Sequence, residues 1–207
     1  MIAIIDYDAG NLKSVEKALQ HLGEECKITR DVEEIATAEK VILPGVGAFQ
    51  DAMEKLEKYQ LADVTREVAR KGTPLLGICL GLQLLFESSE EGPGVQGLGI
   101  LPGRIVAFPK KEGFKIPHMG WNSLKIKPRA TLFRGLGEEP YVYFVHSYYL
   151  EAAELEDVAA TTDYITTVHA SVERGNVYGC QFHPEKSGDV GLQILRNFCQ
   201  LGSDCLS

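Results

Sequence analysis

The chain lacks any apolar run long enough to cross a bilayer. Its longest apolar stretches, such as residues 41–43 and 75–76, are a few residues long, whereas a membrane helix needs about 20 consecutive apolar residues. The first residues show neither a basic start nor a cleavage-like small-residue site, so we expect no secretory leader. These two features predict a protein that does not act in a membrane.

Positive charge is scarce as well. The formal net charge is -8 at pH 7, and binding to nucleic acid or to an anionic membrane needs clustered positive charge. The composition therefore predicts no nucleic-acid partner and no membrane partner.

The sequence also lacks the spacings of a disulfide framework or a metal site. Its five cysteines are an odd number, and no two of them have C-x-x-C spacing. No two histidines are spaced as metal ligands, so we expect neither a metal nor another cofactor. Unpaired cysteines in a chain of this length fit a reducing cytoplasm.

Short β-rich runs alternate with helical patterns, which is typical of an α/β protein. At 207 residues, with 44% hydrophobic and 24% charged content, the chain is most simply one domain over residues 1–207 with a core of its own. A glycine- and proline-rich stretch at 92–127 and a later hairpin indicate a mixed sheet. We expect strands at 2–5, 26–28, 41–43, 74–78, 105–106, 124–126 and 141–145, a hairpin of 165–171 with 177–182, and helices at 12–22, from 48, around 64–68, at 80–86 and around 192–199.

Residues 75–83 (LLGICLGLQ) combine a strand, a Gly-x-Cys-x-Gly turn and a helix. This is the nucleophile-elbow pattern with cysteine in place of serine, and it needs glycines because the turn is tight and strained. The turn would place Cys79 at a helix N-terminus, where the thiolate is favoured. A buried structural cysteine beside two packing glycines would have the same local sequence.

Residues 179–187 (GCQFHPEKS) provide a base for such a nucleophile. Pro184 favours an extended conformation for His183, and residues two apart in an extended segment point to the same side. Glu185 can therefore hold one ring nitrogen of His183 while the other nitrogen faces a thiol. A solvated strand end would explain this segment on its own, but together with the elbow it favours a catalytic pair.

These segments resemble the class I, or triad, glutamine amidotransferases. The match covers residues 77–83 (GICLGLQ) and 181–185 (QFHPE), and 43–47 (LPGVG) is similar to the family's glycine-rich oxyanion strand. The order of the segments agrees, and the resemblance covers essentially the whole chain. It implies a three-layer, flavodoxin-like fold with a central mixed, mostly parallel sheet and helices on both faces.

The resemblance also implies roles for individual residues. Hydrolysis of L-glutamine would use the triad Cys79, His183 and Glu185. Backbone N–H groups that stabilise the oxyanion would come from Gly45, Val46 and Leu80. The residues implied for the glutamine pocket are Gly47, Gln83, His146, Ser147 and Tyr148.

Three segments are similar to those of glutaminase subunits that dock onto a (β/α)8-barrel cyclase subunit. They are residues 117–122 (PHMGWN), 143–149 (YFVHSYY) and 181–187 (QFHPEKS). The resemblance implies a heterodimer in which ammonia passes to the cyclase by a shielded route. The residues implied for the docking face are Trp121, Asn122, Tyr143 and Lys186, although a lone tryptophan and a strand tyrosine are also common in protein cores.

Three alternatives stay open at this point. The chain could be a glutaminase that feeds another synthase, against which residues 117–122 and 143–149 count. It could be a cysteine peptidase or thioesterase on a related scaffold, although Gln83 and Gly45 favour glutamine. It could be a non-enzymatic regulator, which should have lost Cys79, His183 or Glu185.

Overall fold

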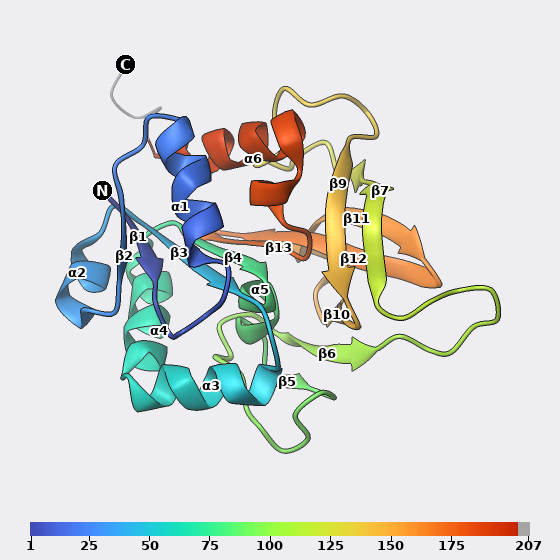
Figure 1. Cartoon of the computed structure of the whole chain (residues 1–207), viewed down its shortest axis with the longest axis horizontal. Coiled ribbons are helices and arrows are strands. Elements are labelled where there is room, and N and C mark those ends of the chain that lie inside the picture. The colour runs from blue at the N-terminus through green and yellow to red at the C-terminus, as the bar shows by residue number, and fades with distance from the viewer. Residues whose placement is uncertain (203–207) are drawn as a thin grey trace.

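The computed structural model describes residues 1–202, and its centre is an eight-stranded sheet of order β2-β1-β3-β4-β13-β12-β11-β8 (Figure 1). The strands are β1 (Ile2–Ile5), β2 (Cys26–Thr29), β3 (Lys40–Gly45), β4 (Leu75–Cys79), β8 (Lys125–Ile126), β11 (Val158–Tyr164), β12 (Thr166–Arg174) and β13 (Val177–Cys180). The helices are α1 (Leu12–His21), α2 (Val32–Thr37), α3 (Phe49–Lys58), α4 (Leu61–Lys71), α5 (Leu80–Leu84) and α6 (Gly188–Gln200), with short 3₁₀ turns at Leu155–Asp157 and Pro184–Lys186.

The sheet has a parallel half and an antiparallel half. Strands β2, β1, β3, β4 and β13 run parallel, in the 2-1-3-4-5 order of flavodoxin-like proteins. Strands β12, β11 and β8 continue it antiparallel. The change of direction occurs at the β12–β13 hairpin, where Gly175 has a φ of 57° that glycine adopts without strain. The predicted mixed α/β fold is confirmed.

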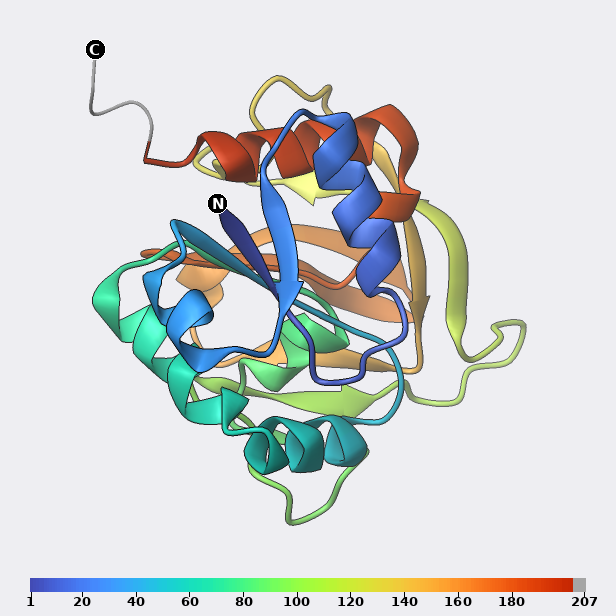
Figure 2. The same cartoon turned by 60° about the vertical axis from the view of Figure 1, so that its left-hand side comes forward.

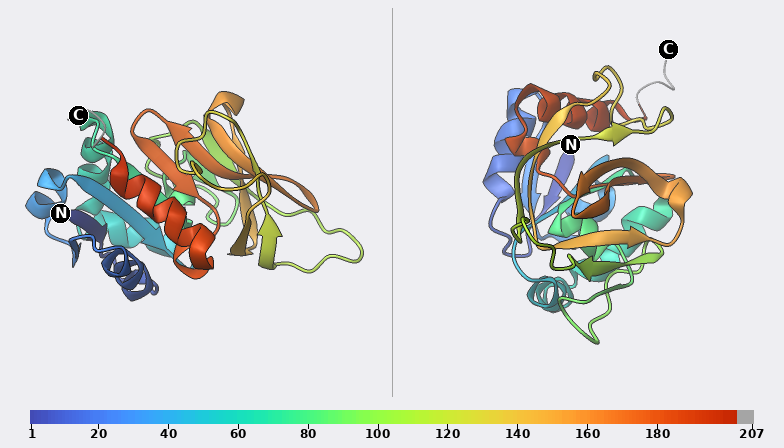
Figure 3. Two further views of the ribbon diagram at one scale, coloured as in Figure 1. Left: turned by 90° about the horizontal axis from the view of Figure 1, so that it is seen from above. Right: turned by 90° about the vertical axis from the view of Figure 1, so that its right-hand side faces the viewer.

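The strands bury both faces because their apolar side chains alternate between two cores. In β1, Ala3 and Ile5 face one core, whereas Ile2 and Ile4 face the other. Helices α2, α3 and α4 cover the first face, and α1 and α6 cover the second; Figures 2 and 3 show these helix layers on opposite sides of the sheet. The result is the expected three-layer arrangement.

Two small sheets extend the two layers at one end of the molecule. One contains β5 (Ser88–Ser89), β6 (Gly103–Ala107) and β10 (Tyr148–Ala152), and the other pairs β7 (His118–Ser123) with β9 (Tyr141–His146). Leu150 of β10 lies in the core beneath α3 and α4, while Phe144 of β9 lies in the core beneath α1 and α6. The chain crosses between the two layers at Ser147, which joins β9 to β10 (Figure 1).

Most of the expected elements are present, with small shifts at their ends; α5, for example, stops at Leu84 instead of residue 86. The prediction missed α2, β5, β7, β10 and β11. Helix α2 has only six residues, too few to show a helical period in the sequence. Asp31 caps it by accepting hydrogen bonds from the N–H groups of Glu33 and Glu34. Strand β11 (VAATTDY) has no regular alternation of apolar and polar residues, and it forms through its pairing with β12.

Among residues 1–202, no helix is both long and apolar enough to span a bilayer.

Candidate active site

Cys79 lies in a strained turn between β4 and α5. Its φ of 54° and ψ of −111° belong to a region that residues other than glycine rarely adopt. A Cβ atom at Gly77 would lie 2.7 Å from the Leu82 nitrogen, and one at Gly81 would overlap the Leu43 carbonyl oxygen. The two glycines therefore allow α5 to pack directly against β3 and β4, and this packing turns Cys79 out of the sheet.

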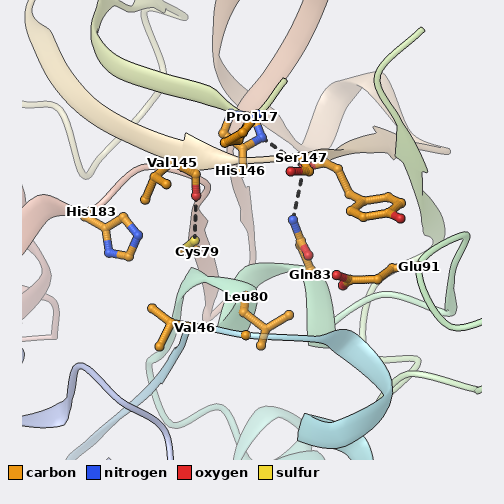
Figure 4. Close-up of a pocket in the computed structure, with 12 residues that line it drawn as sticks. Val46, Cys79, Leu80, Gln83, Glu91, Pro117, Val145, His146, Ser147 and His183 are labelled. Atoms are coloured by element: carbon orange, nitrogen blue, oxygen red, sulfur yellow. Dashed lines mark hydrogen bonds between the residues drawn. The ribbon is translucent and has the colours of Figure 1, made fainter. Parts of the chain in front are cut away.

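The Cys79 side chain reaches a cavity of about 360 Å³ at the end of the molecule where the two small sheets meet (Figure 4). Cavities of this size are typical of small-molecule sites. The lining residues are Val46, Gly47, Cys79, Leu80, Gln83, Glu91, Pro117, Val145, His146, Ser147, Tyr148 and His183.

His183 and Glu185 form a buried pair behind one wall of this cavity. His183 Nδ1 and Glu185 Oε1 are 2.8 Å apart, and both side chains are completely buried. The segment is held in place because the His183 N–H donates to the Tyr143 carbonyl oxygen at 2.9 Å. Since β4 and β13 are parallel neighbours with Ile78 opposite Cys180, the chain brings His183 alongside Cys79.

The His183 ring has one nitrogen left for a reaction. Its Nε2 is buried and has no hydrogen-bond partner within residues 1–202, and the ring lies beside the Cys79 thiol (Figure 4). Burial lowers the pKa of His183, but its interactions with Cys79 and Glu185 raise it more, to about 9. An imidazolium at this position can stabilise a thiolate and donate a proton.

The thiol itself has two polar neighbours. Cys79 Sγ lies 3.8 Å from the Val145 carbonyl oxygen and 3.9 Å from the amide nitrogen of Gln181. Gln181 follows β13 directly and is fully buried. The sequence match contained Gln181, but it gave no role to that residue.

Not all of the residues predicted to stabilise an oxyanion reach the cavity. Val46 and Leu80 line the cavity, whereas Gly45 is buried beneath it, where a Cβ atom would collide with the Tyr7 hydroxyl group. That hydroxyl group donates to the Pro44 carbonyl oxygen at 2.8 Å. Gly45 therefore serves close packing under the 44–47 segment in this structure, and its role toward an oxyanion stays a prediction.

The structure brings the predicted glutamine-binding residues together around the cavity, on two of its sides. Gly47 and Gln83 lie on the α5 side, and the β9–β10 connection contributes the other three, His146, Ser147 and Tyr148. The Gln83 amide nitrogen donates to the Tyr148 carbonyl oxygen and to the Gln181 side chain, both at 3.1 Å.

The four residues predicted to dock a partner lie on β7, β9 and the turn after His183. Trp121 is 56% exposed and packs edge-on against Tyr143 across the β7–β9 pair. Lys186 is exposed. Asn122 differs from the others, because its half-buried amide group bonds to the Ser123 N–H and to the Asp163 carbonyl oxygen inside the protein.

Several residues at the site were missed by the sequence analysis. Asn11 precedes α1 but does not cap it; its amide instead donates to Glu185 Oε1 at 2.9 Å. Glu91 accepts the Phe49 N–H at the start of α3, and Pro117 and Val145 complete the cavity wall. An asparagine before a helix usually signals a cap, so nothing in the local sequence indicated a contact with Glu185.

The remaining cysteines that the structure describes are not disulfide-bonded and lie away from the cavity. Cys180 and Cys199 are buried and Cys26 is partly buried, as expected for core residues. Burial raises the pKa of the Cys199 thiol to about 12, and that of Cys180 even further. Cys205, expected to lie in a C-terminal tail, is outside the described residues. No group of three or more potential metal-ligating side chains converges within residues 1–202.

Comparison with known proteins supports the class that this fold and site suggest. The family model for "Glutamine amidotransferase class-I" matches residues 3–201. A crystal structure of a glutamine amidotransferase superposes with a TM-score of 0.75 at 21% identity, covering 96% of this chain and 100% of that one. The PurLQS structure from Thermotoga maritima gives a TM-score of 0.75 at 20% identity, covering 96% and 97%. These structural likenesses support the fold alone.

Relatives found by sequence identify a branch within this family. The chain is 54% identical over 198 residues to the imidazole glycerol phosphate synthase subunit HisH of Bacillus cereus (strain G9842), covering 96% of this chain and 93% of that one. It is also 54% identical over 200 residues to the subunit of the same name from Moorella thermoacetica, covering 97% and 94%. The chain therefore belongs to the class-I glutamine amidotransferases, in the branch of the imidazole glycerol phosphate synthase HisH subunits. The resemblance noted in the sequence is confirmed.

Proposed function

We propose that this glutamine amidotransferase hydrolyses L-glutamine to glutamate and ammonia through a glutamyl thioester on Cys79, as the glutaminase subunit of imidazole glycerol phosphate synthase. The observation that carries the proposal is the placement of Cys79 on a strained elbow beside a buried His183–Glu185 pair, at the wall of a cavity of about 360 Å³. The same cavity contains Gln83 and the 146–148 segment, which offer polar groups to an amino-acid substrate.

In the first half of the reaction, the Cys79 thiolate attacks the carboxamide carbon of glutamine. The new C–S bond converts the carbonyl oxygen to an oxyanion, which backbone N–H groups of Leu80 and of the 45–47 segment would stabilise. The His183 imidazolium then donates its Nε2 proton to the amide nitrogen. The C–N bond breaks, and ammonia and a glutamyl thioester result.

In the second half, neutral His183 takes a proton from water, and the hydroxide attacks the thioester carbonyl carbon. Collapse of the tetrahedral intermediate breaks the C–S bond and releases glutamate. Cys79 leaves as the thiolate and His183 is again protonated, so the site returns to its starting state. Glu185 holds the His183 ring in one orientation during both steps, at 2.8 Å.

We further propose that the ammonia passes to a (β/α)8-barrel cyclase subunit in a heterodimer. In histidine biosynthesis that subunit forms imidazole glycerol phosphate and aminoimidazole carboxamide ribotide. Ammonia released into water would be protonated and lost as a nucleophile, so a shielded route is needed. Large apolar side chains that are 56–62% exposed on Met119, Trp121 and Tyr141 support a protein partner on the β7–β9 side.

Glutamate release from glutamine tests this function directly. The purified chain is assayed alone, with the cyclase subunit, and with the cyclase plus its ribotide substrate. We expect release to rise strongly only when both the cyclase and its ligand are present. A second assay uses a glutamine-derived electrophile, which should label Cys79 and no other cysteine, as mass spectrometry would detect.

The possible negative results test different parts of the proposal. Activity that ignores the cyclase would keep Cys79 as the nucleophile but would point to a different synthase. A folded chain that binds the cyclase yet releases no glutamate under any condition would refute the catalytic assignment. Cys26→Ala is the matched control, because Cys26 is a partly buried thiol remote from the cavity.

A further inference from the structure

Two histidines form a buried pair between the β7–β9 surface and the glutamine pocket. His118 on β7 lies opposite His146 on β9, and His118 Nδ1 is 2.9 Å from His146 Nε2. Both side chains are buried, and only His146 lines the cavity. The catalytic steps proposed above use neither ring, so the pair needs another explanation.

The direction of the hydrogen bonds in this pair is fixed at the cavity end. His146 Nδ1 is 2.9 Å from the Tyr148 carbonyl oxygen, and a carbonyl oxygen can only accept. His146 Nδ1 must therefore carry the hydrogen, which leaves its Nε2 as an acceptor when the ring is neutral. It follows that His118 Nδ1 also carries a hydrogen and donates it to His146.

Asn122, at the other end of the chain of hydrogen bonds, fixes the same donor-to-acceptor direction. The Asn122 amide nitrogen lies 3.3 Å from His118 Nε2 and donates to the Asp163 carbonyl oxygen at 3.1 Å. The Asn122 amide oxygen accepts the Ser123 N–H at 2.9 Å, so the amide group cannot be reversed. Backbone groups at both ends thus impose one orientation on the whole chain of bonds, from Asn122 through both histidines to Tyr148.

The surroundings of the two rings keep them neutral. His118 is stacked between Phe144 and Tyr164, with ring centroids 4.7 and 4.0 Å away. Burial lowers the pKa of His118 to about 4 and that of His146 to about 3. Each ring therefore carries a single N–H at neutral pH, as the chain of bonds requires.

The chain of bonds ends on an atom that also orders Gln83. The Tyr148 carbonyl oxygen accepts from Gln83 Nε2, whose second hydrogen goes to the Gln181 side chain. With both amide hydrogens engaged, the Gln83 amide oxygen is left to accept a hydrogen bond from a ligand. The ammonium group of an amino acid is a donor of the required kind.

We propose that His118 is a positioning residue for glutamine binding, because the hydrogen that it donates satisfies His146 Nε2 and so holds the ring whose Nδ1–H orders Tyr148 and Gln83. This inference rests on the proposed function, since it takes glutamine to be the ligand. If His118 could not donate, His146 Nε2 would be a buried acceptor without its partner. The ring would then be free to turn its Nδ1–H away from the Tyr148 carbonyl oxygen, and the carbonyl group would lose its fixed direction.

Two variants of His118 separate the donated hydrogen from the packing of the ring. His118→Phe keeps an aromatic ring between Phe144 and Tyr164 but donates nothing. His118→Asn loses the stacking but can place an amide donor near the position of Nδ1. The matched control is His169→Asn, because His169 is a partly buried histidine whose Nδ1 accepts the Ala152 N–H, away from the cavity.

The experiment has a spectroscopic arm and a kinetic arm. Nitrogen NMR of ¹⁵N-histidine-labelled protein at neutral pH reports which ring nitrogen of His146 carries the hydrogen. Steady-state glutaminase kinetics of the complex with the cyclase and its ligand give KM and kcat. We expect a single Nδ1–H tautomer at His146 in the wild type and in His118→Asn, and a mixture of the two tautomers in His118→Phe, because the ring is no longer held against Tyr148. KM for glutamine should rise about tenfold in His118→Phe, which corresponds to the usual free energy of one ordered hydrogen bond. The change in kcat should be smaller. In His118→Asn, KM should return part of the way to the wild-type value.

Three results would overturn the positioning role: a wild-type His146 with its hydrogen on Nε2, a His118→Phe protein with an unchanged KM, or an equal rise in KM in His169→Asn. A wild-type complex that releases no glutamate would overturn the proposed function instead. The nitrogen spectra would still decide on the chain of hydrogen bonds, because they need no turnover.

Discussion

The two sides of the cavity are built by different means. On the β4–α5 side the backbone makes the site: two glycines that tolerate no side chain force Cys79 to a φ of 54°. On the β7–β9 side the two strands pair in continuous register, and side chains make the site through ring stacking and hydrogen bonds such as the one of 2.9 Å between His118 and His146. The first side presents the nucleophile, and the second orders the pocket that faces it.

This difference indicates how each side should respond to mutation. The β4–α5 side should be disrupted by an added atom, because its packed main-chain atoms have no room to move. The β7–β9 side should be disrupted by removal of a hydrogen-bond donor or an aromatic ring, and such a removal should leave the fold intact.

Cys79→Ala should have the largest effect, on activity alone. Removing a covalent nucleophile costs roughly 10⁴- to 10⁶-fold in rate in comparable hydrolases, whereas the buried side chain is small, so we expect the chain to fold and to bind the cyclase. Glutamate release and cyclase binding are measured together. Substantial residual hydrolysis in this variant, beside an unaffected Cys26→Ala control, would remove Cys79 from the mechanism.

Glu185→Gln should reduce glutaminase activity by roughly 10³- to 10⁴-fold, as loss of the orienting carboxylate does in other triads. The carboxylate helps to raise the pKa of His183 to about 9, so the wild-type rate should fall above that pH as the imidazolium is lost. In the variant this decline should begin at a lower pH. The control is Glu151→Gln, which removes an exposed partner of Arg104 and should leave the pH profile unchanged.

The same pKa has a consequence for stability. Because the value in the folded state lies above the ordinary 6.5, the contribution of His183 to stability is complete below pH 6.5 and is lost as the pH rises through about 9. A pH-independent difference in unfolding free energy between wild type and Glu185→Gln would contradict the ion pair.

Gly81→Ala should destabilise the fold by roughly 3 kcal/mol or more, in the range of severe overpacking. The added methyl group would overlap the Leu43 carbonyl oxygen and push α5 away from β3. Urea unfolding measures the loss. Gly137→Ala is the matched control, because a Cβ atom there meets nothing within 4 Å. Equal stability of the two variants would mean that the elbow does not depend on close packing.

Trp121→Ala should weaken binding of the cyclase by roughly 30-fold, the range of an aromatic hot spot. Trp121 is 56% exposed, so the unfolding free energy should hardly change. Titration with the cyclase measures the dissociation constant. Leu155→Ala serves as the control, since Leu155 is similarly exposed at 64% but lies outside β7 and β9; a larger loss of affinity there would place the docking face elsewhere.

The smallest effect should appear when two inactive variants are compared. Cys79→Gly should be more stable than Cys79→Ala by about 1–2 kcal/mol, because glycine adopts the elbow conformation without strain. Unfolding in urea gives the difference. The same comparison at Cys199, inside helix α6, should have the opposite sign, since glycine disfavours helices. A more stable Cys79→Ala would show that the turn is relaxed.

The backbone-built side of the cavity was predictable from the sequence, because its cause is local. The Gly-x-Cys-x-Gly segment between a strand and a helix specifies the elbow, and the continuous apolar run of β1 specifies a strand buried on both faces. His183 and Glu185 were predictable for the same reason, since they lie two residues apart in an extended segment.

The side-chain-built side was predictable only in part. Residues 117–122 stood out as a motif, but no strand was expected there, because β7 exists through its pairing with β9. The contact of Asn11 with Glu185 joins residues at opposite ends of the chain, and local sequence patterns do not report such contacts. The His118–His146 bond depends on the register of two strands, which the spacing of the two histidines does not reveal.

Cys79 ends strand β4, and His183 follows the end of its parallel neighbour β13. This arrangement has an evolutionary consequence. Strands β4 and β13 are bonded in register, so their ends stay together whatever the length of the chain that connects them. Part of that chain is the exposed loop at residues 109–116 between β6 and β7, which projects from the body in Figure 1. Insertions and sequence drift in this loop leave the nucleophile and its base in place, so descendants of this chain can acquire new contacts at the cavity mouth while the geometry of the reacting groups is inherited.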